Sequence, residues 1–236
     1  MGKMKGRLIT FEGIDNCGKT TQTKLLEDYL RGKGVQVVVG REPGGTSYGE
    51  TVRMILKHPE DVFRVMNTMF AGYYDFHRIN QKQRRDKVTE ILFYMAARRE
   101  FVVHNVLPAL KEGKTYIADR YSDSTRAYQG GGLFKSDSFY VKIINILNDV
   151  VTRRAVPDVT FWLDISYDEM MRRQKQLGRS PDFIEKRGRS YFNRVIKEYS
   201  RIIDEEKRFI RVDGTKSVDD IFNNDILPRI NRLFGF

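Results

Sequence analysis

The sequence predicts an α/β fold: one domain with a mostly parallel sheet covered by helices. Three observations predict it. Five short apolar runs alternate with longer helical patterns, the chain of 236 residues has the length of one large domain, and neither an internal repeat nor a low-complexity linker divides it. Buried parallel strands typically read as continuous apolar runs joined by helices. We therefore expect a single domain over residues 1–236.

The expected strands are the five apolar runs, residues 8–11, 35–39, 115–118, 159–163 and 209–212. A helical pattern over about residues 19–31 follows the first run, and a Gly-Lys-Gly turn leads into the second. Gly113 precedes the third run and Pro157 precedes the fourth, and both residue types mark turns. Helical patterns fill most of the remaining gaps, as connections between parallel strands require.

Two stretches fit this alternation less well. Residues 58–86 carry five aromatic side chains followed by a basic run, and we expect a helical insertion there. Residues 172–189 hold seven Lys and Arg side chains around Gly178 and Pro181, which is typical of a mobile basic loop. Both stretches lie between expected strands, so neither changes the predicted sheet.

Composition and charge narrow the class of protein. Hydrophobic residues make up 40% and charged residues 31%, which excludes a collagen-like, low-complexity or globally disordered chain. The net charge of +11 favours partners that carry phosphate, such as nucleotides, nucleic acid or an anionic membrane surface. The single cysteine excludes an intramolecular disulfide and a cysteine zinc site. No apolar run could span a bilayer and no signal peptide is visible, so we expect a cytoplasmic protein without membrane contact.

Residues 13–20 match the phosphate-binding P-loop pattern in full, reading Gly-Ile-Asp-Asn-Cys-Gly-Lys-Thr. The segment follows an expected strand and opens an expected helix, which is the context that the pattern requires; a chance glycine-rich turn is the alternative. We expect Lys19 to reach the β- and γ-phosphates and the Thr20 hydroxyl to bind Mg²⁺. The residues expected to bind ATP are Gly13, Ile14, Asp15, Asn16, Cys17, Gly18, Lys19, Thr20 and Thr21. The side chain of Cys17 is expected to pack rather than to sense redox state.

Further motifs follow the P-loop along the chain. They are Arg41–Thr46 (Arg-Glu-Pro-Gly-Gly-Thr), Phe93–Arg98 in a helical pattern, Asp119–Tyr121 (Asp-Arg-Tyr) and Ser124–Gly132. Together with the P-loop they cover most of the chain, from Leu8 to about residue 220, and resemble the thymidylate kinase (dTMP kinase) family. The resemblance implies a P-loop kinase fold with a five-stranded parallel sheet, the reaction ATP + dTMP → ADP + dTDP with Mg²⁺, and a homodimer.

The resemblance also implies how the phosphate of the acceptor is held. Arg53 and Arg120 would bind it, for which arginine is suited because its planar guanidinium donates two parallel hydrogen bonds. Arg41 would help them or would only anchor its own loop. Asp119 would bind Mg²⁺ through a water molecule, with Glu12 as a second carboxylate, or would only cap the following helix.

The base and the sugar are assigned in the same way. Arg98 would hydrogen-bond the thymine edge, and Tyr94, four residues earlier on the same helix face, would stack on the ring. A solvated Arg98 and a core Tyr94 are the alternatives. The remaining implied acceptor residues are Thr125 against the base, Tyr128 at the ribose 2′ position, Asp15 at the sugar 3′-hydroxyl, and Ser124.

The chemistry needs no general base, because a monophosphate oxygen is already anionic near neutral pH, with a second pKa of about 6. Catalysis is then positioning and neutralisation of charge. Some family members carry a catalytic arginine directly after the P-loop Asp, where this chain has Asn16, so the basic loop, as a lid over ATP, should supply it. The candidates are Arg172, Arg173, Arg179, Arg187 and Arg189, and the expected catalytic set is Lys19, Arg120, Arg173 and Arg179. A solvated basic face is the alternative.

Other interpretations stay open. A kinase for another deoxynucleoside monophosphate would use the same arginines, whereas a deoxynucleoside kinase would need a general-base carboxylate instead. A nucleic-acid-binding P-loop NTPase is favoured only by the charge, and no groove-reading motif is visible. The lid motif that often reads Asp-Arg-Ile-Glu in the family reads Asp-Phe-Ile-Glu at residues 182–185. The aromatics of residues 58–86 would form extra core, contact a second copy or cover the acceptor pocket.

Overall fold

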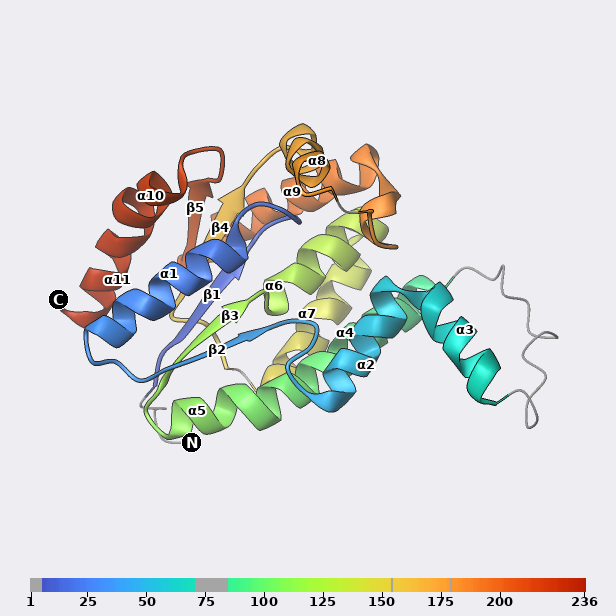
Figure 1. The fold of residues 1–236 in the computed structure, drawn as a ribbon, viewed down its shortest axis with the longest axis horizontal. Helices are drawn as coiled ribbons and strands as arrows, with labels where there is room; N and C mark the ends of the chain where they lie inside the picture. The colour runs from blue at the N-terminus through green and yellow to red at the C-terminus, as the bar shows by residue number, and fades with distance from the viewer. Residues whose placement is uncertain (1–5, 71–84, 154, 179) are drawn as a thin grey trace.

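The structure, a computed structural model, describes residues 6–70, 85–153, 155–178 and 180–236. Its centre is a five-stranded parallel sheet in the order β2-β3-β1-β4-β5 (Figure 1). The strands are β1 (Leu8–Glu12), β2 (Val37–Arg41), β3 (Thr115–Asp119), β4 (Val159–Asp164) and β5 (Phe209–Asp213). The predicted fold class is confirmed.

Strand β2 alone begins later than the sequence predicts. It starts at Val37 rather than at Val35, because Val35 closes the preceding helix instead. The N–H of Val35 donates to the carbonyl of Leu30 at 3.0 Å, while Gly34 takes a φ of 78°. This is the left-handed ending that glycine commonly gives to a helix, and it delays the extended backbone by two residues.

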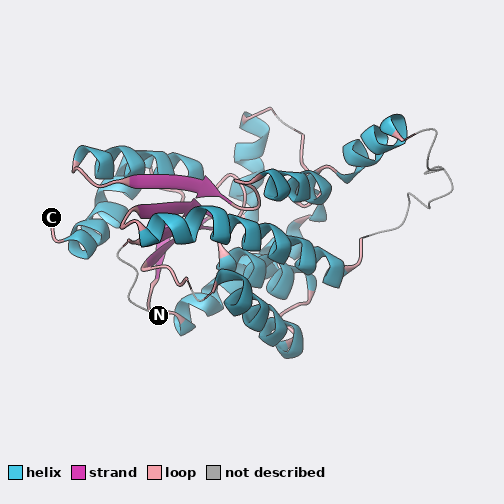
Figure 2. Ribbon diagram, turned by 90° about the horizontal axis from the view of Figure 1, so that it is seen from below, coloured by secondary structure: helices cyan, strands magenta, loops and turns pink. Residues whose placement is uncertain are grey.

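Helices cover both faces of the sheet (Figure 2). The α-helices are α1 (Lys19–Gly32), α2 (Ser47–Lys57), α3 (Pro59–Met69), α4 (Lys87–Phe101), α5 (Leu107–Lys111), α6 (Ser122–Thr125), α7 (Ser138–Thr152), α8 (Tyr167–Gln176), α9 (Arg189–Glu205), α10 (Val218–Asp220) and α11 (Leu227–Phe234). The π-helical turns η2 (Val102–Val106), η3 (Arg126–Leu133) and η5 (Ile221–Ile226) and the 3₁₀ turn η4 (Glu185–Arg187) join several of them. In the part of the chain that the structure describes, no helix is long and apolar enough to cross a bilayer.

The core lies on both sides of the sheet because successive strand residues point to opposite faces. In the central strand, Ile9 packs into the larger core cluster with α1 and α9, whereas its neighbour Leu8 packs into a second cluster with α4 and α5. In β3, Ile117 and Tyr116 divide between the two clusters in the same way. Every residue of β1 is buried, which explains why three of its five residues are large and apolar.

The predicted helical insertion is present in its first part. Helix α3 lies away from the sheet, and none of its residues is buried (Figure 1). Phe63 is 51% exposed, so the expectation that it forms extra core is wrong. The rest of the insertion, residues 71–84, lies outside the described residues, and with it three of the aromatics noted in the sequence.

Candidate active site

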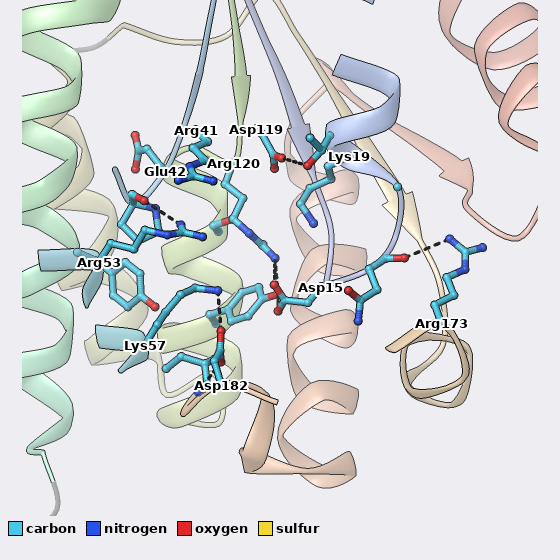
Figure 3. A pocket seen from close by; sticks show the side chains of 18 of the residues that line it. Asp15, Lys19, Arg41, Glu42, Arg53, Lys57, Asp119, Arg120, Arg173 and Asp182 are labelled. Atoms are coloured by element: carbon cyan, nitrogen blue, oxygen red, sulfur yellow. Dashed lines mark hydrogen bonds and ion pairs between the residues drawn. The ribbon is translucent and has the colours of Figure 1, made fainter. Parts of the chain in front are cut away.

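A cavity of about 880 Å³ lies at the carboxyl ends of β1, β2 and β3, where ligands bind in open α/β sheets (Figure 3). The P-loop closes one side of it, and helices α2 and α4 and the segment after β3 close the other. Residues expected from the sequence that line it are Asp15, Asn16, Gly18, Lys19, Thr20, Thr21, Arg41, Arg53, Tyr94, Arg98, Asp119, Arg120, Ser124, Thr125, Tyr128 and Arg173. The fold thus brings the two sets of expected residues together around one space.

The P-loop forms a tight cradle at the start of α1. Gly13 takes a φ of 134°, and a Cβ atom there would lie 2.5 Å from the carbonyl oxygen of Leu163, so only glycine fits. Lys19 curls over the loop and donates from Nζ to the carbonyl of Ile14 at 2.8 Å. No side chain caps the start of α1, which leaves its first N–H groups for an anion. The side chains of Ile14 and Cys17 pack in the core, so these two residues can contribute only backbone atoms.

Two oxygen ligands suited to Mg²⁺ lie beside the cradle. The hydroxyl of Thr20 donates to a carboxylate oxygen of Asp119 at 2.7 Å, and both residues line the cavity. Mg²⁺ prefers oxygen ligands and usually keeps several water molecules while it binds one or two protein groups and the phosphates of a substrate. The hydroxyl and the carboxylate therefore fit the ion, and their contact indicates that a single ion could reach both.

Arg120 extends from the end of β3 across to the P-loop. Its guanidinium donates to the carbonyl of Gly13 at 2.7 Å, to Asp15 at 3.0 Å and to the Tyr128 hydroxyl at 2.9 Å. Burial alone would raise the pKa of Asp15, but the nearby positive charges, Arg120 foremost, more than offset it and hold that pKa well below its usual range. Arg120 has a φ of 74°, a region that few residues other than glycine adopt and that is often found at functional sites.

Three guanidinium groups gather on the acceptor side, those of Arg41, Arg53 and Arg120. Arg53 donates to the carbonyl of Pro43 at 2.9 Å, and Arg41 pairs loosely with Glu50 at 3.7 Å. Burial, followed by the charges of neighbouring arginines, lowers the pKa of Arg53. A cluster of positive charges that disfavour one another in this way is stabilised by a dianion, and a phosphate monoester is such a group.

The guanidinium of Arg98 is held by four groups although it lines the cavity. It is 1% exposed and forms an ion pair with Glu42 at 2.8 Å from Nε. Its terminal nitrogens donate to Thr125, Asn148 and the carbonyl of Tyr121, at 2.8, 2.9 and 2.9 Å. Since the four terminal N–H groups make three bonds, one remains for a ligand. The solvated alternative for Arg98 is therefore wrong.

Tyr94 lies one helical turn before Arg98 and lines the same wall of the cavity. Burial, with a contribution from the charge of Glu90, raises the pKa of Tyr94, so its hydroxyl stays protonated at neutral pH. Tyr94 is partly exposed, not part of the core clusters formed by the described residues. Its ring is therefore available to a planar ligand.

Glu12 has a different place from the one the sequence suggested. It is fully buried at the end of β1, where its carboxylate binds residues other than Asp119. Its carboxylate accepts from the Ser124 hydroxyl at 2.5 Å, from the Tyr199 hydroxyl at 2.8 Å and from the Tyr121 N–H at 2.8 Å. Burial foremost raises the pKa of Glu12 to about 7. Glu12 thus fixes the turn that carries Arg120.

The basic loop is shorter than predicted. Helix α8 continues to Gln176, so Arg172 and Arg173 lie on a helix, and Arg189 begins α9. The helix persists because Ser166 caps its start and Glu169 pairs with both arginines, at 2.7 and 2.6 Å.

The candidate arginines of that loop differ in where they point. Arg173 alone among the described candidates lines the cavity: it donates to the carbonyls of Asn16 at 3.2 Å and Gly214 at 2.6 Å. Arg187 pairs with Glu90 and Arg189 with Asp168. Arg179 lies outside the described residues.

Several cavity residues had no role assigned from the sequence. They are Glu42, Pro43, Lys57, His58, Gln129, Gln176, Leu177, Ser180, Asp182, Ile184 and Val218. Glu42 and Gln129 belong to the motifs noted above, so the sequence did indicate the segments in which they lie. Lys57 ends α2 without any motif, and its side chain forms an ion pair with Asp182 at 2.7 Å across 125 residues.

Comparisons with known proteins agree with one another. The sequence matches the family model for thymidylate kinase over residues 11–81 and 75–224. It is 34% identical to the thymidylate kinase of Thermoanaerobacter sp. (strain X514) over 97% of this chain and 99% of the relative, and 37% identical to that of Caldanaerobacter subterraneus subsp. tengcongensis over 91% and 90%. The crystal structure of thymidylate kinase from Ehrlichia chaffeensis aligns with a TM-score of 0.64 at 32% identity, over 97% of this chain and 98% of that one.

Proposed function

The chain belongs to the thymidylate kinase family, and from that premise we propose how its pocket phosphorylates dTMP with ATP. The observation that carries the proposal is the meeting, in one cavity, of the P-loop with Lys19 and of Arg53 and Arg120. Two phosphate-binding sets that face each other suit a reaction in which a phosphoryl group passes from one phosphate to another. The acceptor oxygen is already anionic, so no residue has to remove a proton.

On the donor side, residues 13–21 would hold ATP through backbone N–H groups and Lys19. Thr20 and Asp119 would hold Mg²⁺, which neutralises charge on the phosphates when it is bound. Arg173 donates to the carbonyl of Asn16. Asn16 occupies the P-loop position at which some other members of the family carry an arginine, so Arg173 lies beside that position. We propose that Arg173, together with Lys19 and Arg120, neutralises the negative charge on the transferring phosphoryl group.

On the acceptor side, Arg53 and Arg120 would bind the phosphate of dTMP, with Arg41 at its rim. Asp15, kept ionised by Arg120, would accept a hydrogen bond from the sugar 3′-hydroxyl, and Tyr128 would crowd the 2′ position. Ser124 is bound by Glu12 and would act by fixing the turn around Arg120.

The base would lie against Tyr94. The remaining N–H of Arg98 would donate to a carbonyl of thymine, and Thr125, which accepts from Arg98, keeps its own hydroxyl proton for a base acceptor. Because Arg98 has no acceptor atom, an amino group at that edge of the base would meet a donor and be rejected.

A homodimer is supported by an apolar surface that we call the outer stripe. It consists of Val88 and Leu92 on α4 and Phe139, Ile143, Ile146 and Val150 on α7, all of them exposed. The residues recur every three or four positions on each helix, so each set lies along one helical face. The two helices pack against each other, and their stripes are suited to pack against a second copy. A cytoplasmic location stays a prediction.

The reaction is tested by ADP release in a coupled assay with ATP, Mg²⁺ and a panel of nucleoside monophosphates and nucleosides. We expect turnover with dTMP, loss of turnover in Lys19→Ala, and in Arg98→Ala a loss that depends on the base. Turnover with another acceptor alone would contradict the base contacts of Tyr94, Arg98 and Thr125. Hydrolysis of ATP that no acceptor stimulates would contradict the kinase itself and favour the nucleic-acid-binding alternative.

A further inference from the structure

The segment of residues 180–187, here called the lid segment, is docked on the acceptor side of the cavity. Lys57 at the end of α2 pairs with Asp182 at 2.7 Å, and the N–H of Phe183 donates to the carbonyl of Lys57 at 3.2 Å. Lys57 and Asp182 both line the cavity. The segment thus forms part of the cavity wall and is joined there to α2, the helix that carries Arg53.

Glu90 makes a second set of contacts with the lid segment. It is on α4, one turn before Tyr94, and is 2% exposed. It accepts two hydrogen bonds from Arg187 of the lid segment, at 3.0 and 2.5 Å, and one from Gln129 at 3.0 Å. Arg85 forms an ion pair with it at 3.3 Å. One buried carboxylate therefore joins three parts of the chain: the lid segment, Arg85 near the end of the insertion, and η3, whose Gln129 lines the cavity.

The charges of this cluster do not balance on their own, because two guanidinium groups share one carboxylate. Arg85 offsets part of the excess by donating to the carbonyls of Ile55 and Leu56, at 2.9 and 3.0 Å, at the negative end of α2. Aromatic rings face both guanidinium groups: the guanidinium carbons of Arg85 and Arg187 lie 4.9 and 5.7 Å from the centroid of Phe183, and that of Arg187 lies 5.0 Å from the centroid of Tyr191. An aromatic face attracts cations most strongly where water is excluded, so Phe183 is held between two arginines that Glu90 fixes.

The lid segment keeps its shape by bonds of its own. A carboxylate oxygen of Asp182 accepts from the N–H groups of Ile184 and Glu185, both at 2.9 Å, and the Asp182 N–H donates back to Glu185 at 2.9 Å. This reciprocal pattern is that of a capping box. Loss of the Phe183 ring should therefore loosen the attachment of the segment without unfolding it.

We propose that Glu90 is a positioning residue for phosphoryl transfer, which holds the lid segment on the acceptor-binding helix α4 through Arg85, Arg187 and the ring of Phe183. The inference rests on the proposed roles of Tyr94 and Arg98, which α4 also carries. A nucleoside monophosphate seated on α4 and a docked lid segment then stabilise each other. The docked segment also keeps water from the transferring phosphoryl group, which limits hydrolysis of ATP.

The test compares Glu90→Gln and Phe183→Ala with the wild type, with Phe183→Tyr as a conservative replacement that keeps the aromatic face. Arg31→Met, a change on the surface of α1, is the control. Two quantities are measured: the ratio of phosphoryl transfer to acceptor-independent ATP hydrolysis, and amide hydrogen exchange in peptides covering residues 180–187 and 13–21. Phe183→Ala loses the aromatic contact, so we expect it to lower the ratio about tenfold and to raise the KM for dTMP about tenfold. Amide exchange should become faster only in the peptides that cover the lid segment.

Phe183→Tyr should restore wild-type values, and Arg31→Met should keep them. If Glu90→Gln does not fold, Phe183→Ala decides. Exchange in residues 180–187 that stays at the wild-type rate in Phe183→Ala, or a transfer ratio that stays unchanged, overturns the proposal. Because exchange is measured on the protein alone, it tests the docking even if the wild type prefers another acceptor, and a wild type that transfers to no acceptor would overturn the proposed function separately.

Discussion

Arg120 joins the two sides of the pocket, since its guanidinium contacts Gly13 and Asp15 of the P-loop and Tyr128 of the acceptor wall. Lysine at this position keeps the charge but loses the planar fork, so it cannot make these contacts together. We expect Arg120→Lys to lower kcat/KM for dTMP by about 100-fold, the usual effect of removing a preorganised donor. Steady-state kinetics beside a thermal melt check this, with Arg31→Lys as the control; an unchanged kcat/KM would contradict the role.

Glu12 gives the protein a pH-dependent stability. Its pKa of about 7 in the folded state lies above its value in the unfolded chain, so the folded state binds more protons between about pH 4.5 and 7. The contribution of Glu12 to stability is therefore fully present below pH 4.5 and is lost as the pH rises through 7, and the change amounts to about 3 kcal/mol.

The measurement is denaturant unfolding of the wild type and of Glu12→Gln at several pH values between 4.5 and 7.5. Glutamine cannot titrate, so the free energy of unfolding of the wild type should fall relative to that of the variant as the pH rises. A difference between the two proteins that is the same at every pH would refute the raised pKa.

Helix α2 depends on a local cap. The Thr46 hydroxyl, at the end of the loop that joins β2 to α2, accepts from the N–H of Gly49 at 3.0 Å. Thr46→Ala should lower the free energy of unfolding by about 1 kcal/mol, whereas Thr46→Ser should leave it near the wild-type value because serine caps as well. Urea unfolding of the three proteins distinguishes the outcomes, and equal stability of the alanine and serine variants would mean that the cap contributes nothing.

Elements marked by a pattern of residue types could be predicted, whereas features that depend on specific pairs of side chains could not. The strands and the P-loop each depend on a few consecutive residues, so their positions follow from the sequence to within two residues. The extent of α8 depends on Glu169, because its ion pairs with Arg172 and Arg173 stabilise the helix through this basic stretch. A basic composition alone does not distinguish such a face from a loop.

The same distinction applies to the candidate site. The motifs identified Arg98 and Arg120, and the cavity brings both together. They could not identify Lys57 or Glu90, because the partners of Lys57 and Glu90 lie 125 and 97 residues away and their bonds exist only in the folded chain. Positioning residues are recognised by such contacts, which no short pattern encodes.

At the scale of the whole molecule, helix α4 serves two surfaces. Its inner face carries Arg98 into the cavity, and its outer face carries Val88 and Leu92 of the outer stripe. These sets alternate around the helix, as the helical repeat allows. A second copy packed on the outer stripe would therefore stabilise the helix that carries Tyr94 and Arg98 without entering the pocket.

The oligomeric state follows from the same surface. We expect a homodimer in solution and a monomer for Ile146→Glu, because a carboxylate at the centre of the α7 stripe would be buried without a partner. Light scattering after gel filtration measures the mass directly.

Phe63→Glu, on the equally exposed but separate helix α3, should leave the dimer intact. A wild-type monomer would contradict the dimer, and a dimer that survives Ile146→Glu and is lost in Phe63→Glu would place the interface elsewhere. The outer stripe shares no residue with the lining of the cavity, so the monomeric variant should keep phosphorylating dTMP, with a KM raised only as far as α4 depends on the contact.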